Sequence, residues 1–153
     1  MMYPRRDIRK VFKYPQGRQL RINGIVPTNL LAYPDLLGDN DQPCLIVLKD
    51  GNSTDLTVGR ATGVESFVRD DDTGQESIEL AIYNYNKRSG EFLQKGDSGS
   101  LIVDRLGRMV GGDVQGGLDT ADGAPMWWLW PRIKAKYPYA DLNHVAGWHQ
   151  TLV

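Results

Sequence analysis

The stretch Cys44–Val68, CLIVLKDGNSTDLTVGRATGVESFV, has the pattern of antiparallel β-strands joined by a tight turn. Cys44–Leu48 is a short apolar run typical of a buried strand, and Asp50-Gly51 is a common hairpin-turn pair. Leu56–Val58 begins the return strand, and Val64–Val68 is again rich in β-branched and aromatic residues. The stretch therefore predicts a hairpin followed by further short strands.

The same pattern continues toward the C-terminus. Residues 69–75, RDDDTGQ, turn the chain at what we interpret as a solvated hairpin tip, and residues 76–85, ESIELAIYNY, alternate apolar and polar side chains. The runs SLIV (100–103) and RMVGGDV (108–114) form a second predicted hairpin, with Gly107 supplying a positive φ. About six short strands at this spacing predict an all-β antiparallel barrel or sandwich.

The two ends of the chain differ from this centre. Residues 1–43 hold several turn-forming segments and few strand patterns, which predicts an irregular, partly packed N-terminal arm. Residues 125–138, PMWWLWPRIKAKYP, predict a helix anchored on the barrel by its tryptophans, and Pro131 predicts a helix start near Trp130. The expected domains are an arm at 1–43, a barrel with its closing helix at 44–142, and a tail at 143–153.

Composition narrows the classes of function. The 153 residues carry a formal net charge of −1 with a pI of about 6.1, which does not favour nucleic acid or an anionic membrane as partner. Only the segment Tyr3–Lys10, YPRRDIRK, is basic, and it is interpreted as solvated. The single cysteine, the absence of an apolar leader and the lack of a membrane-length apolar run favour a cytoplasmic location. No metal site or cofactor is expected, because histidine and cysteine do not cluster.

The segment Gln94–Asp104, QKGDSGSLIVD, places a serine in a glycine-flanked turn. A serine hydroxyl becomes an effective nucleophile only when a base takes its proton and donors bind the resulting oxyanion. The glycines allow a tight turn that can direct the amides of Gly96 and Ser98 toward one point. The same tripeptide, Asp-Ser-Gly, also occurs in ordinary hairpins and helix caps, so an inert turn is the alternative interpretation.

The wider context resembles a known family. The hairpin Cys44–Gly63, the motif Gly96–Gly112 (GDSGSLIVDRLGRMVGG) and the helix Ala124–Pro138 together resemble the C-terminal barrel of chymotrypsin-like (trypsin-fold) serine peptidases. The likeness extends in particular to trypsin-like domains of fungal intracellular proteins, and it covers roughly Cys44–Leu142. It implies an all-β fold: a six-stranded antiparallel Greek-key barrel, one half of a trypsin-like double barrel, with an N-terminal arm and a C-terminal helix.

The resemblance also implies roles for the motif residues. Ser98 takes the nucleophile position, and the amides of Gly96 and Ser98 form the oxyanion hole. Asp97 matches an aspartate that supports the site by pairing with a newly freed N-terminus in zymogen-activated members. No such terminus is evident here, so Asp97 needs another cation, a backbone donor or solvent.

Further residues match the substrate-binding segments of the family. Val114, Gln115 and Gly116 correspond to the strand that pairs with the substrate backbone, and Gly116 and Gly117 leave room beside a side-chain pocket. Phe92 lies at the position of the pocket base, which implies a small or apolar preference. Asp113 is left with two interpretations, a pocket residue selecting a basic substrate side chain or a solvent-facing strand residue.

The catalytic triad is incomplete in this chain. The family places its histidine and aspartate before the serine on another barrel, whereas His144 and His149 both follow Ser98. The 43 residues before Cys44 are too few for a second barrel. We therefore expect a nucleophile-bearing half, inactive or nearly so alone, that acts on a protein or peptide substrate with an N-terminal barrel fragment or partner chain. The alternative is a peptidase-derived, non-catalytic protein-interaction module.

Overall fold

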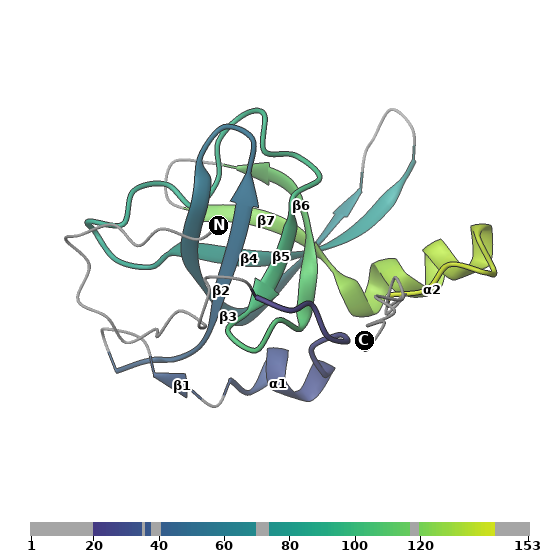
Figure 1. The fold of residues 1–153 in the computed structure, drawn as a ribbon, viewed down its shortest axis with the longest axis horizontal. Helices are drawn as coiled ribbons and strands as arrows, with labels where there is room; N and C mark the ends of the chain where they lie inside the picture. The colour runs from purple at the N-terminus through teal and green to yellow at the C-terminus, as the bar shows by residue number, and fades with distance from the viewer. Residues whose placement is uncertain (1–19, 35, 38–40, 70–73, 117–119, 143–153) are drawn as a thin grey trace, which may run out of the picture.

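The core of the protein is a closed six-stranded antiparallel β-barrel (Figure 1). The computed structural model describes residues 20–34, 36–37, 41–69, 74–116 and 120–142. The order around the barrel is β2-β3-β4-β7-β6-β5, and pairing of β2 with β5 closes it, which confirms the all-β barrel expected from sequence. The strands are β2 Pro43–Gly51, β3 Asp55–Arg69, β4 Glu76–Asn84, β5 Leu101–Asp104, β6 Met109–Gly116 and β7 Thr120–Pro125.

Both hairpins predicted from the sequence are confirmed. Asp50 and Gly51 are still paired in the ladder, Gly51 with Asp55, so the first turn lies at Asn52–Thr54 and not at Asp50-Gly51 as predicted. Gly107 has a φ of 80° in the turn between β5 and β6. The barrel consists of two three-stranded meanders, β2-β3-β4 and β5-β6-β7, which pair with each other along β4–β7 and β2–β5. Residues 85–100 connect the two meanders, and they contain the serine motif.

Strand β2 is buried on both faces, because the barrel interior covers one face and other segments cover the second. Leu45 and Val47 point into the barrel core beside residues of β4 and β5, as strand alternation requires. Leu48, on the opposite face, belongs to a second buried cluster that includes Val103 and Met126. This double burial explains why the segment appears in the sequence as a continuous apolar run.

The N-terminal arm is more regular than its sequence predicts. It contains the helix α1 (Thr28–Ala32) and the short strand β1 (Leu36–Leu37), which pairs with the start of β2. Val26 and Leu31 are buried in the barrel core, so the described part of the arm completes that core. Burial of these two apolar residues orders the described part of the arm, although its turn-forming residues hide any helix or strand pattern in the sequence.

The closing helix α2 spans Met126–Lys136, so the predicted start near Trp130 is wrong. Pro131 lies inside the helix, where a proline removes one backbone hydrogen bond. The first turn forms ahead of it because Met126 is buried and Trp127 packs against the core. Tertiary packing therefore outweighs the local cost of the proline, and the later turns extend away from the barrel (Figure 1).

Candidate functional site

The serine motif forms two consecutive tight turns, here called the Ser98 loop (residues 94–100). The Asp97 amide donates to the Gln94 carbonyl at 3.1 Å, and the Ser100 amide donates to the Asp97 carbonyl at 2.9 Å. Gly96 and Gly99 occupy the third positions of these turns with φ values of 104° and 89°. Such values favour glycine, so the glycines of the motif serve the turn conformation predicted for them.

Ser98 is exposed at the second position of the second turn and belongs to neither a strand nor a helix. Within the part of the chain that the structure describes, the amides of Gly96 and Ser98 donate no hydrogen bond to another group of the protein. The Ser98 hydroxyl is likewise unbonded to described groups. The serine and the two amides are therefore available to a ligand from solvent.

Asp97 points in the opposite direction and is buried. Its Oδ2 accepts hydrogen bonds from Lys49 Nζ at 2.8 Å, Thr54 Oγ1 at 2.7 Å and the Gln94 amide at 3.1 Å. Its Oδ1 accepts from the amides of Ser53 at 2.7 Å and Thr54 at 3.2 Å. Five donors hold one carboxylate, so the Ser98 loop is anchored to the tip of the β2–β3 hairpin.

Lys49 supplies the cation that the sequence left unidentified for Asp97. Both side chains of this ion pair are fully buried. Lys49 lies on the same face of β2 as Leu45 and Val47, so it points into the barrel at the end nearest the β2–β3 turn. Its ammonium lies 5.7 Å from the centre of the Phe92 ring and donates to Thr54 Oγ1 at 2.6 Å. Sequence reasoning missed Lys49, although its inward position in the alternating strand was a usable signal.

Close packing between the loop and the hairpin leaves no space for larger residues. A methyl group on Gly51 would overlap Asp97 and Lys49, and one on Gly96 would overlap the Ser53 side chain. The Ser53 hydroxyl also donates to the Lys95 carbonyl at 2.9 Å. The hairpin tip therefore holds the Ser98 loop through Lys95, Gly96 and Asp97 and makes no contact of this kind with Ser98.

Two opposing effects set the pKa of Asp97. Burial raises it, but the hydrogen bonds from Lys49, Thr54, Ser53 and Gln94 together lower it by more, so the pKa lies far below its ordinary value. The carboxylate is therefore charged in the folded protein at neutral pH. The charge stays because the ammonium and the fixed donors replace the water lost on burial.

Acid is expected to destabilise the fold from about pH 4 downward. Because the folded-state pKa of Asp97 is lowered, its stabilisation is present above the unfolded-state pKa of about 3.9 and declines as pH falls toward the folded-state value. Urea unfolding of wild type and Asp97→Asn over this range measures the effect. The variant should lack this part of the pH dependence, and equal slopes for both proteins would contradict the assignment.

The predicted substrate-binding residues fall into two places. Phe92 is 1% exposed in the barrel core, so a substrate could reach its ring only by displacing other core groups. Asp113, Val114, Gln115 and Gly116 lie on β6, with the shift in register against β7 falling between Asp113 and Gln115. Gly117 lies outside the described residues.

The register of β5 and β6 brings the Ser98 loop beside this part of β6. Leu101 pairs with Gly112, so the chain before Leu101 leads back toward the loop alongside the residues after Gly112. Among the described residues, β6 beyond Gly112 pairs only with β7 and leaves its other edge unpaired. An unpaired edge next to an exposed serine is a position where an extended peptide could add as a strand.

No histidine lies among the described residues, because His144 and His149 fall outside them. The described part of the chain contains no group of three histidine, cysteine or acidic residues placed to hold a metal ion. Within the same part, no helix has the length and apolar character needed to cross a membrane. No protein-family model and no curated protein matches this chain.

Proposed function

We propose that this chain is the nucleophile-bearing half of a trypsin-like serine endopeptidase. The observation that carries the proposal is the buried Lys49–Asp97 pair beneath an exposed Ser98, with the Gly96 and Ser98 amides unbonded to described groups. An ordinary hairpin turn has no need of a fully buried ion pair, which is costly to desolvate. A turn that must hold two amides and a hydroxyl in fixed positions gains rigidity from it.

The proposed chemistry is acyl transfer. Ser98 Oγ attacks the carbonyl carbon of a peptide bond, and a base outside the described residues takes the hydroxyl proton. The Gly96 and Ser98 amides then donate to the oxyanion. The carbon–nitrogen bond breaks, the amine leaves with that proton, and water hydrolyses the resulting ester. The chain so described contributes nucleophile and oxyanion hole but not the base.

The topology supports this proposal. The spatial order β5-β2-β3-β4, in which β5 returns beside β2, supports the Greek-key barrel that we include in the proposal. The unpaired edge of β6 offers a place for the substrate backbone next to Ser98. Cys44 is buried and is in no disulfide, which accords with the reducing cytoplasmic compartment that we include in the proposal.

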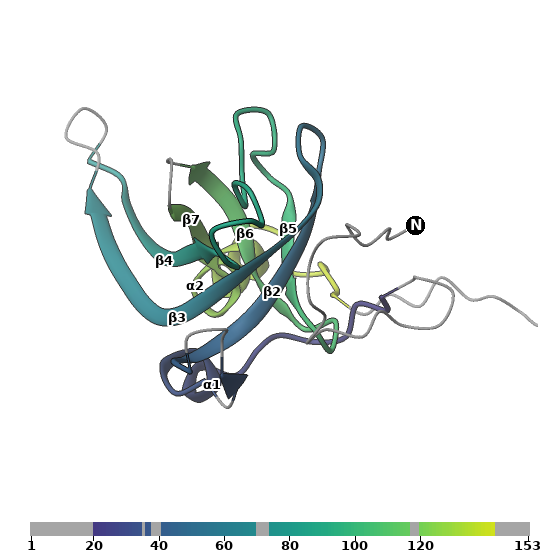
Figure 2. The same ribbon diagram turned by 90° about the vertical axis from the view of Figure 1, so that its left-hand side faces the viewer.

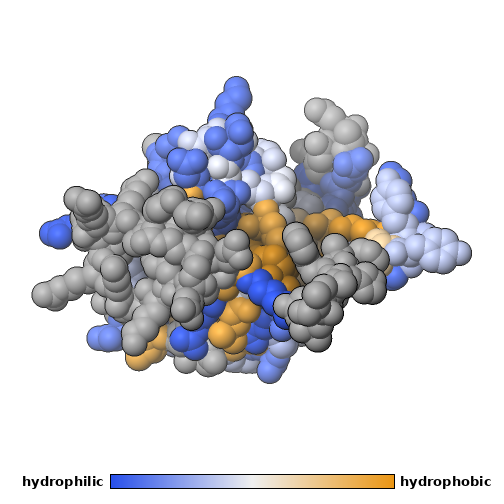
Figure 3. Space-filling model, viewed as in Figure 1, coloured by the Kyte–Doolittle hydropathy of each residue, from blue (hydrophilic) through white to orange (hydrophobic). Residues whose placement is uncertain are grey.

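A surface on the barrel is suited to a partner chain that would bring the base. Figure 3 shows apolar side chains gathered in the middle of one face, over β5 and β6, between polar regions. Leu101 of β5 and Leu106 of the following turn are 36% and 58% exposed. Exposed apolar patches of this kind mark association sites. We propose a second barrel, from a precursor or a partner, as the source of the histidine and aspartate.

The test is covalent modification by a fluorophosphonate, in which Ser98 Oγ bonds to phosphorus and fluoride leaves. An oxyanion hole without a base retains about 10³–10⁴-fold catalysis over water, so Ser98 should react about 10³-fold faster than the exposed Ser66. Peptide mass spectrometry of a time course measures both sites in one sample. Ser98→Ala should abolish the fast modification, and Ser66→Ala should leave it intact.

Equal rates at Ser98 and Ser66 would overturn the peptidase proposal. That result would favour the alternative, a non-catalytic interaction module that keeps the barrel without an active serine. The observation that favours this alternative is that both histidines, His144 and His149, follow Ser98 in the sequence, whereas the family places its histidine before the serine. The comparison of the two serines therefore separates the two functions.

A further inference from the structure

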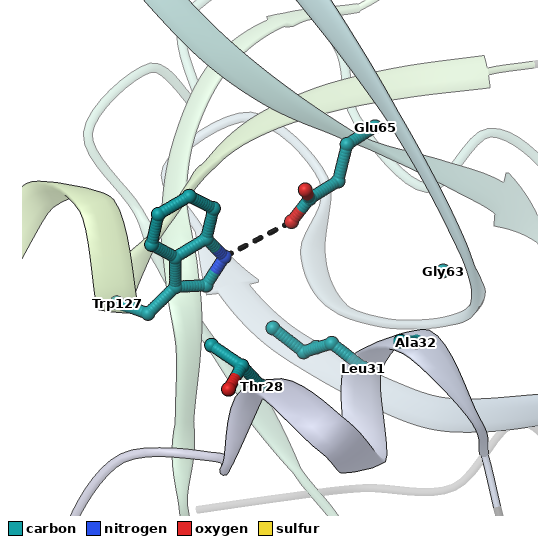
Figure 4. A pocket seen from close by; sticks show the side chains of 6 residues that line it. All are labelled: Thr28, Leu31, Ala32, Gly63, Glu65 and Trp127. Atoms are coloured by element: carbon teal, nitrogen blue, oxygen red, sulfur yellow. Dashed lines mark hydrogen bonds between the residues drawn. The ribbon is translucent and has the colours of Figure 1, made fainter.

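A pocket of about 210 Å³ lies where the arm, the bend of β3 and the start of α2 meet (Figure 4). It lies by α1, at the end of the barrel opposite the tip of the β2–β3 hairpin that holds the Ser98 loop (Figures 1 and 2). We call it the Glu65–Trp127 pocket. It is lined by Thr28, Leu31, Ala32, Gly63, Glu65 and Trp127.

The pocket combines one negative charge with aromatic and aliphatic walls. Trp127 Nε1 donates to Glu65 Oε1 at 2.9 Å, which fixes the carboxylate and the indole relative to each other. Figure 4 shows the Leu31 side chain between these two groups and the helix α1. Among the described residues that line the pocket, only Glu65 is charged, so a cationic guest meets a carboxylate with no lining cation beside it.

Beside this pocket the backbone of β3 approaches α1 closely. Gly63 has a φ of 80°, and a methyl group there would come too close to the Leu31 carbonyl. The register of β3 against β4 shifts between Ala61 and Glu65, so the strand bends beside α1. A bulge of this kind redirects a side chain, and here it redirects Glu65 toward Trp127.

An unpaired strand edge adjoins the pocket. Beyond Ala61, β3 pairs with β4 but has no partner on its β2 side among the described residues. The ribbon of β3 and β4 extends out from the barrel (Figure 2). Val64 and Phe67, which flank Glu65 and Ser66 on this ribbon, are 52% and 66% exposed. Free edges with exposed apolar side chains accept an added strand from another protein.

We propose that the Glu65–Trp127 pocket binds a lysine side chain of a partner protein whose extended segment pairs with the free edge of β3. The pocket is smaller than the roughly 300–1,000 Å³ of small-molecule sites, which fits a single side chain. An ammonium group beside the indole pairs with the Glu65 carboxylate, which neutralises its charge. Because Glu65 Oε1 already accepts from Trp127, the compact lysine ammonium fits better than the two-pronged arginine guanidinium.

The test uses nuclear magnetic resonance of the full chain with three probes. These are N-acetyl-lysine-N-methylamide, its norleucine counterpart without the charge, and the peptide acetyl-Thr-Val-Lys-Val-Thr-amide. The lysine amide should shift the Trp127 indole resonance and the amides of Thr28, Ala32 and Gly63. The pentapeptide should bind at least about tenfold more tightly than the lysine amide, because it adds backbone pairing along β3.

Two variants separate charge from folding. Glu65→Gln keeps an acceptor for Trp127 but removes the charge, and it should weaken lysine binding about tenfold. Glu79→Gln, on the same ribbon but outside the pocket, should leave the affinity unchanged. Equal binding of the lysine and norleucine amides, or unchanged affinity in Glu65→Gln, would overturn the charged pocket. A pentapeptide no tighter than the lysine amide would overturn strand addition.

This site is independent of the proposed peptidase chemistry. Ser98→Ala should leave binding of all three probes unchanged, because Ser98 does not line the pocket. Failure of the fluorophosphonate test would therefore not affect this proposal, and loss of probe binding would not affect the assignment of Ser98.

Discussion

Replacing Asp97 with asparagine is expected to lower the free energy of unfolding by about 3–5 kcal/mol, because it leaves the buried Lys49 ammonium without its counter-charge. The asparagine amide group would also face donors, since the carboxylate oxygens accept from five groups. Urea unfolding of the full chain at neutral pH measures the change. A cost below about 1 kcal/mol would contradict a rigid, fully buried pair.

Removing the other partner is the matched comparison. Lys49→Met should cost less than Asp97→Asn, because Thr54, Ser53 and Gln94 still donate to the carboxylate. The double variant should be more stable than the sum of the two single effects predicts, because it leaves neither charge alone. Additive effects would mean that the two side chains do not interact as the distance of 2.8 Å implies.

Replacing Gly96 with alanine is expected to slow fluorophosphonate modification of Ser98 by about 10²–10³-fold. Gly96 has a φ of 104°, and an added methyl group would overlap the Ser53 side chain, so the turn has to change its backbone conformation. That change moves the Gly96 amide away from the proposed oxyanion position. Loss of one such donor typically costs this factor in rate.

Gly99→Ala is the control for backbone strain in the same loop. Its φ of 89° is similarly unfavourable to alanine, but no heavy atom lies within 4 Å of the added methyl group. We expect a comparable loss of stability from strain and less than about a tenfold change in the rate at Ser98. Equal slowing by both variants would show that the Gly96 amide has no special role.

Features formed by neighbouring residues were predictable from the sequence. The β2–β3 hairpin and the turn at Gly107 follow from local backbone preferences and are confirmed, but the hairpin turn itself lies at Asn52–Thr54, just beyond Asp50-Gly51. The barrel follows from about six short strands with polar turns. The family resemblance also implied that Asp97 needed another cation, a backbone donor or solvent, and the structure provides a cation and backbone donors.

Features that depend on distant residues were not predictable in the same way. Lys49 and Asp97 lie 48 residues apart, and no local pattern links them. The start of α2 was wrong because burial of Met126 overrides the preference of Pro131 for a first turn. The Glu65–Trp127 pocket joins residues from α1, β3 and α2, so it exists only in the folded chain.

A crystal structure of the fluorophosphonate adduct tests the central claim most directly. The claim is our proposal that the Lys49–Asp97 pair holds the loop so that the Gly96 and Ser98 amides bind an anionic oxygen. We predict the phosphoryl oxygen at about 2.7–3.1 Å from both amide nitrogens, with phosphorus bonded to Ser98 Oγ. An adduct whose phosphoryl oxygen points into solvent, away from both amides, would contradict this account.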